Sequence, residues 1–236
     1  MIWQHSAEAY KELIEASDWD SKLLRKRGLI PNILEFVGNC EDLVVLDAGT
    51  GTGWLFDYIK PAQAHACDIV TPSTLPDGVK FTQQEVRSLN YDAATFDLIV
   101  ASLLLIYCED IREVCAEFHR VAKPGGGRLV VSLMHPYFYR TGKVTEEEDF
   151  LVTHDLSKPF EIPLKIAGQV GPVTYYYRPL PDYVNAFIAT GWTIRRMHDW
   201  FINMADYRTI IDQGVRSKVR RTGRVPLFTF IECTAA

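Results

Sequence analysis

The chain has 236 residues, of which 47% are hydrophobic, and its 25 basic and 30 acidic residues give a formal net charge of −5. This length and composition predict one compact domain, and the negative balance argues against a nucleic-acid partner. The five cysteines form no C-x-x-C pair and no apolar run approaches about 18 residues, so we expect a soluble protein of the reducing cytosol without a membrane span. Secretion is not expected either, because no charged-then-apolar leader opens the chain.

The first part of the chain is predicted to be helical. Apolar residues recur at helical spacing over 6–37 and Pro31 suits a helix start, so we expect residues 1–40 to form a helical cap. Over residues 41–134, strand-like apolar runs then alternate with helix-like segments, which is typical of a doubly wound, mostly parallel α/β sheet. The predicted order is strand 43–47, helix 53–60, strand 64–69, strand 79–83, strand 96–101, helix 109–122 and strand 127–133.

Residues 135–180 contain scattered prolines and an acidic run, and are predicted to form an irregular insertion after the fifth strand. Residues 181–236 predict helix 181–190 and two strands, 192–197 and 226–233, that close the sheet as an antiparallel hairpin. If the segment 175–177 is extended, Tyr175 and Tyr177 share one face, which either lines a pocket or packs in the core.

The segment 44–55 carries the strongest functional signal. Its sequence VVLDAGTGTGWL predicts a buried strand that runs into a glycine-rich turn, where the backbone can approach a ligand closely. A dinucleotide fingerprint would read G-x-G-x-x-G, but Trp54 stands at the position of its third glycine. Asp68 follows at the end of the next predicted strand, where an acid can accept hydrogen bonds from ribose hydroxyls. The alternative is a plain strand–helix turn followed by a capping aspartate.

The spacing D-x-G-x-G-x-G from Asp47 to Gly53 resembles motif I of the class I S-adenosylmethionine (SAM)-dependent methyltransferases. Further elements are similar to those of the branch of this family that methylates small molecules. They are TFDLIVAS at 95–102, FHRVAKPGGGRL at 118–129, HPY at 135–137, YRPL at 177–180 and ATGW at 189–192. The resemblance implies a Rossmann-like seven-stranded sheet, SAM as the cofactor and a small-molecule acceptor, with no metal required. The acceptor itself and the oligomeric state are not indicated.

The resemblance also implies which residues bind the cofactor. The glycine loop passes beneath it, Asp47 orders its methionine amino end, and Asp68 holds its ribose. Ala122 departs from the family's usual leucine, and Glu85 stands where an aspartate usually touches the adenine. Tyr10 resembles a capping tyrosine of the family, with ordinary helix packing as the alternative. The expected cofactor-binding set is Tyr10, Asp47, Gly49, Thr50, Gly51, Gly53, Asp68, Ile69, Glu85, Val86, Ser102 and Leu103.

The acceptor side is less defined. His135 follows the fifth strand directly and is the candidate general base, since the pKa of histidine lies near working pH; it could instead cap the turn before Pro136. Arg178 is a candidate anchor for an acidic acceptor group, or an ion-pair partner that ties down the insertion. His154, within the insertion, is a weaker candidate.

Three other functions remain open. A nucleic-acid methyltransferase would use the basic residues between 216 and 224, although a solvated loop explains them as well and no D/N-P-P-Y signature follows the fourth strand. A nicotinamide-dependent oxidoreductase is disfavoured by the glycine spacing. A SAM-binding protein without chemistry is the third, because no single residue is diagnostic of methyl transfer.

Overall fold

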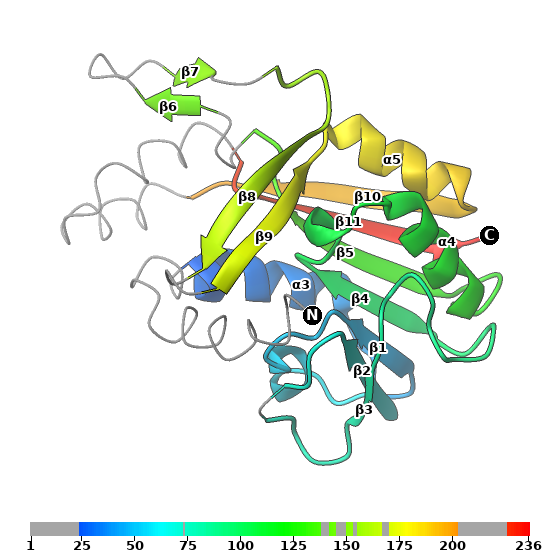
Figure 1. The fold of residues 1–236 in the computed structure, drawn as a ribbon. Helices are drawn as coiled ribbons and strands as arrows, with labels where there is room; N and C mark the ends of the chain where they lie inside the picture. Colours follow the sequence, from blue (N-terminus) through cyan, green and yellow to red (C-terminus); the bar gives the residue numbers. More distant parts are fainter. Residues whose placement is uncertain are drawn as a thin grey trace.

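The computed structural model describes residues 24–72, 74–137, 142–144, 150–152, 155–166, 170–202 and 226–236. Within these residues, seven strands form one sheet in the order β10-β11-β5-β4-β1-β2-β3 (Figure 1). The strands are β1 (Val44–Ala48), β2 (Gln63–Asp68), β3 (Lys80–Gln83), β4 (Leu98–Ser102), β5 (Arg128–Met134), β10 (Trp192–Trp200) and β11 (Phe228–Ala235).

Six of the seven strands run in the same direction, so their carboxyl ends lie at one edge of the sheet. β1 to β5 are parallel, and β11 is antiparallel to both β5 and β10, so β10 runs in the same direction as β5. β1, β2, β3, β4, β5 and β10 therefore all end at one edge of the sheet, which we call the carboxyl edge. The predicted Rossmann-like sheet with a closing antiparallel pair is confirmed.

Helices cover both faces of the sheet. α3 (Ile30–Val37) packs on one face against Val45, Val130 and Phe230, while α4 (Ile111–Val121) and α5 (Leu180–Ala189) pack on the other (Figure 1). Alternate residues of the central strands enter the two clusters, which explains why these strands read as unbroken apolar runs. The five-residue π-helix Arg25–Leu29 precedes α3, and the rest of the predicted helical cap, residues 1–23, lies outside the described residues.

Two predicted elements are corrected. Instead of helix 53–60, the chain forms only a short 3-10 helix, Trp54–Asp57, because Gly53 still closes a turn onto the Thr50 carbonyl and Pro61 disfavours helical geometry at the residue before it.

The insertion is not irregular where it is described. It forms the hairpins β6 (Gly142–Val144) with β7 (Phe150–Val152) and β8 (Phe160–Ile166) with β9 (Val170–Tyr177). Prolines occur within β8 and β9, and among the described residues each of these strands pairs with one neighbour only, so a residue without an N–H is tolerated on its other side.

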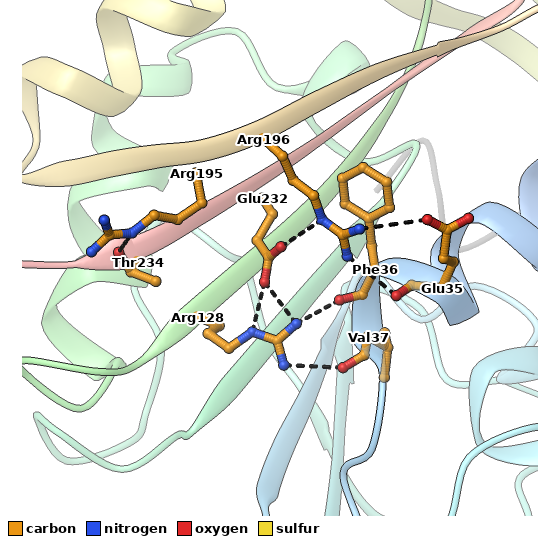
Figure 2. Close-up of polar contacts among 8 residues, drawn as sticks. All are labelled: Glu35, Phe36, Val37, Arg128, Arg195, Arg196, Glu232 and Thr234. Carbon is orange, nitrogen blue, oxygen red and sulfur yellow. Dashed lines mark hydrogen bonds and ion pairs between the residues drawn. The ribbon is translucent and has the colours of Figure 1, made fainter.

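A charged network joins α3 to the closing strands (Figure 2). The Glu232 carboxylate accepts from Arg128 and Arg196, each at 2.8 Å. The same arginines donate to the last carbonyls of α3: Arg128 to Phe36 and Val37 and Arg196 to Glu35. Cations at a helix C-terminus interact favourably with its dipole, so this network fixes α3 against β5, β10 and β11.

Glu232→Ala is expected to lower the free energy of unfolding by about 1.5–3 kcal/mol, the range for hydrogen bonds to charged groups. The Glu232 side chain is only 13% exposed and holds both arginines. Urea unfolding measures the loss. Glu35→Ala is the control, because its 70% exposed carboxylate contributes at most about 1 kcal/mol. Equal losses in the two variants would contradict the bridging role.

Candidate functional site

The glycine loop after β1 is tied to the end of β2 by backbone hydrogen bonds. The N–H groups of Gly49 and Thr50 donate to the Cys67 carbonyl at 2.9 and 3.1 Å. The N–H of Gly51 donates to the Asp68 carboxylate at 2.9 Å. The two predicted halves of the site, the loop and the acid of the next strand, are therefore in direct contact at the carboxyl edge.

Of the three loop glycines, Gly51 faces open space. A Cβ at Gly49 would lie 2.7 Å from Leu104, and one at Gly53 would lie 2.5 Å from Leu75, so both glycines are packed against protein. A Cβ at Gly51 would meet no atom of the described residues within 4 Å, although its φ of +56° disfavours any side chain. The loop thus presents bare backbone to an empty region at Gly51, as a cradle for a closely approaching ligand would.

Asp47 is buried beneath this loop. Its carboxylate is 2% exposed and accepts a 2.6 Å hydrogen bond from the Thr50 hydroxyl. Burial raises the pKa of Asp47 to about 7, and the nearby charge of Asp68 adds to the rise, while the Thr50 hydrogen bond opposes it. A cationic ligand group beside Asp47 would compensate the buried charge.

The buried carboxyl group predicts a pH effect on stability. Because the pKa of Asp47 is raised on folding from its ordinary value near 4, the unfolded chain loses this proton first as the pH rises. The contribution of Asp47 to the free energy of unfolding should therefore fall between about pH 4 and pH 7. Urea unfolding of the ligand-free protein and of Asp47→Asn across this window measures it. Parallel pH profiles for the two proteins would contradict the raised pKa.

Asp68 is held by backbone donors and still has acceptor positions left. One carboxylate oxygen accepts from Gly51 and the other from the N–H of Val70 at 3.1 Å. Burial raises the pKa of Asp68, and the backbone hydrogen bonds lower it. A carboxylate has about four lone-pair positions, so about two remain for a ligand. Ile69, 36% exposed, adds apolar surface next to them.

The turn after β4 is strained and braced by β5. Leu103 has a φ of +54°, an uncommon conformation for a residue with a side chain. Its N–H donates to both the carbonyl and the hydroxyl of Ser132, at 3.0 and 3.1 Å, and the Ser132 hydroxyl reaches that of Ser102 at 3.3 Å. From this turn Leu104 packs against Gly49. Ser102 and Leu103 therefore lie beside the glycine loop, where the sequence places them.

Two other predicted cofactor residues lie after β3. Glu85 is exposed and pairs with Arg87 at 2.5 Å, whereas Val86 is buried in the core. Tyr10 lies outside the described residues, as does His154.

His135 is buried at the end of β5, and both of its ring nitrogens face partners. Nδ1 accepts a 3.2 Å hydrogen bond from the N–H of Tyr137, and Nε2 lies 3.7 Å from a carboxylate oxygen of Asp199. Burial lowers the pKa of His135, and the charge of Asp199 opposes this shift. The ring is therefore neutral near pH 7, with a backbone hydrogen bond on the nitrogen that would act as a base.

Arg178 joins the insertion to the segment after β4. Its guanidinium donates to the carbonyls of Cys108 and Glu109, with the Cys108 contact at 2.7 Å, and it lies over the ring of Tyr176. Among the described residues Arg178 contacts carbonyls and no carboxylate, so it joins the insertion to this segment without the ion pair that the alternative expected. Tyr175 and Tyr177 do share a face, and that face is buried in the core.

Sequence reasoning missed Asp199 and Thr229. The Thr229 hydroxyl donates to Asp199 at 2.7 Å, next to His135. The only available signal was an acid two residues beyond the predicted end of strand 192–197.

Within the described residues, no helix is long and apolar enough to cross a membrane, and no group of three or more His, Cys, Asp and Glu side chains could hold a metal.

Residues 46–130 match the family model of the methyltransferase domain. A malonyl-[acyl-carrier protein] O-methyltransferase of Erwinia billingiae is 28% identical over 60% of this chain and 61% of its own length. The thiol S-methyltransferase TMT1B of Rattus norvegicus is 26% identical over 52% of this chain and 58% of its own. This chain therefore spans about three-fifths of the length of these relatives.

The fold has solved counterparts. The crystal structure of an S-adenosylmethionine-dependent methyltransferase from Mesorhizobium loti superposes with a TM-score of 0.68, at 21% identity, over 86% of this chain and 96% of that one.

Proposed function

Because this chain belongs to the class I SAM-dependent methyltransferase family, we propose that it transfers the methyl group of SAM to a small-molecule acceptor. The observation that carries the proposal is the loop at Gly51, whose bare backbone faces open space while its N–H is held by Asp68. Open α/β sheets bind ligands at the carboxyl ends of their strands, and the loop lies at that edge.

The residues at the loop fit SAM. The free acceptor positions of Asp68 suit the two ribose hydroxyls, and the exposed Ile69 beside it suits the flat adenine. Asp47 lies beneath the loop as a buried carboxyl group whose charge the cationic methionine end would compensate. Ser102 ends β4 and Leu103 follows it, on the side of β1 opposite to Asp68 at the end of β2. Bound SAM would supply an electrophilic methyl group on its sulfonium sulfur, with S-adenosylhomocysteine as the leaving group.

The protein itself must bind SAM and the acceptor, orient them for in-line transfer, and exclude water from the space between them. Fixing two reactants in line replaces a bimolecular encounter and can supply a large part of the acceleration. The turn at Leu103 is held by three hydrogen-bonding groups of β4 and β5, which suits a wall that must not move during transfer. The insertion is the proposed acceptor side, because β9 packs on the short helix Leu105–Tyr107 that follows this turn.

The acceptors named for the relatives differ, one being a malonyl group on an acyl-carrier protein and another a thiol. Similarity to these relatives does not assign either acceptor to this chain. The acceptor must therefore be found by experiment.

For His135, the hydrogen bond on Nδ1 supports a positioning role more than that of a general base. His135→Gln is expected to raise the acceptor KM several-fold and to change kcat little. Steady-state kinetics with the identified acceptor measures both constants, and SAM affinity serves as the control. A fall in kcat of about 10²-fold or more at unchanged KM would establish the base instead.

Methyl transfer is tested with isotopically labelled SAM and fractionated cell extract. Label should enter the small-molecule fraction and depend on the protein. Label in the RNA or protein fraction would move the acceptor to another class. A protein that binds SAM and labels no fraction would contradict the proposed transferase activity.

A further inference from the structure

Three polar residues from neighbouring strands meet at the carboxyl edge, apart from the glycine loop. Asp199 lies near the end of β10 and is paired in register with Thr229 of β11, which is paired in turn with Leu133 of β5. His135 follows Leu133 by two residues and therefore returns to the same side. The three polar side chains form one row across β10, β11 and β5.

The Thr229 hydroxyl and the His135 ring both face the Asp199 carboxylate. The Thr229 hydroxyl donates to one oxygen at 2.7 Å. Because Nδ1 of His135 accepts from the N–H of Tyr137, the neutral ring carries its proton on Nε2, which lies 3.7 Å from the other oxygen. The lowered pKa of His135, caused by burial, agrees with a neutral ring that orients the carboxylate.

The exposure of the three residues is uneven. Thr229 is fully buried and His135 is 4% exposed, whereas the Asp199 side chain is 39% exposed. At 3.7 Å the contact with Nε2 is longer than a hydrogen bond, so among the described residues only Thr229 donates a hydrogen bond to this carboxylate. Two buried groups thus hold a carboxylate that faces outward. Among the residues that the structure describes, no lysine or arginine forms an ion pair with Asp199.

The distance of Asp199 from the turn at Leu103 favours a contact with the acceptor rather than with SAM. Strands in a sheet lie about 4.8 Å apart, and β10 lies three strands from β4, so Asp199 is roughly 14 Å across the sheet from the turn at Leu103. The ring of Tyr137, 54% exposed, lies against the ring of His135 with 5.0 Å between ring centroids, which adds aromatic surface beside His135. An ammonium group is bound by carboxylates through charge-assisted hydrogen bonds and by aromatic rings through cation–π interactions.

We propose that Asp199, held by Thr229 and His135, binds a protonated amine at the end of the acceptor remote from the methylated atom. This inference rests on the proposed function and names the class of acceptor that the site takes. A carboxylate at the same end of an acceptor would be repelled by Asp199.

Two probes of equal ring size and opposite charge test the proposal: tyramine and 4-hydroxyphenylacetate. Each is titrated by ligand-observed NMR into protein saturated with S-adenosylhomocysteine. Wild-type protein should bind tyramine at least about tenfold more tightly, since a charge-assisted hydrogen bond is worth at least this factor. Asp199→Asn should remove the preference, and Thr229→Val, which keeps the shape but not the hydroxyl, should reduce it. Asp42→Asn removes an exposed acid from the turn before β1 and should leave the preference unchanged.

Equal binding of the two probes by wild-type protein would overturn the proposal, as would binding of neither probe or a preference that survives in Asp199→Asn. Binding of S-adenosylhomocysteine, measured beforehand, separates these results from a failure of the proposed function. Protein that binds S-adenosylhomocysteine but shows no preference for the amine would refute only the role of Asp199.

Discussion

Gly51→Val is expected to abolish binding of SAM and S-adenosylhomocysteine. The side chain would occupy the space above the loop, where no atom of the described residues lies within 4 Å of a Cβ, and would exclude a ligand that lies against the backbone. Isothermal titration calorimetry measures the loss, and circular dichroism shows whether the fold is retained.

The variant also introduces a β-branched residue at a φ of +56°, so its control must carry the same strain. Gly125→Val does so, because Gly125 has a φ of +71° and also faces open space, but lies in the turn before β5 at the opposite edge of the sheet. Gly125→Val should bind SAM normally. Loss of binding in both variants would mean that strain, not occupation of the cradle, explains the effect.

Asp68→Ala is expected to weaken binding of SAM by about 1.5–3 kcal/mol, or roughly tenfold to a hundredfold, the range for hydrogen bonds to a charged group. The substitution removes the free acceptor positions and also the two that hold Gly51 and Val70. Asp68→Asn should lose less affinity for SAM than Asp68→Ala, because the asparagine side chain keeps one carbonyl oxygen as an acceptor.

The same calorimetric titrations compare these variants with Asp92→Ala, which removes an exposed acid from the loop before β4. Unchanged affinity in Asp68→Ala would place the ribose elsewhere.

The sheet and its cofactor edge could be predicted from sequence because their signals are local. β1 and β4 are covered on both faces, so each reads as a short apolar run, and Asp47 to Gly53 carries its spacing within seven residues. Asp68 could be placed because it ends the very next strand. The parallel order then brings these residues to one edge.

Features that depend on distant residues could not be predicted. Asp199 comes next to Thr229 and His135 only because β11 lies between β5 and β10 in the sheet. No local sequence pattern encodes this strand order and register. Arg178 finds its carbonyl partners about 70 residues earlier in the chain. The hairpin β8–β9 contains prolines that read as breakers in the sequence, yet a two-stranded ribbon tolerates them at its free edges.

The most direct test of the account is a calorimetric titration of the purified protein with SAM, S-adenosylhomocysteine and NAD. We expect saturable binding of SAM and S-adenosylhomocysteine, and no competition by NAD, because Asp68 and the loop at Gly51 form a site with the glycine spacing of a methyltransferase. Saturable binding of NAD without binding of SAM would contradict the account.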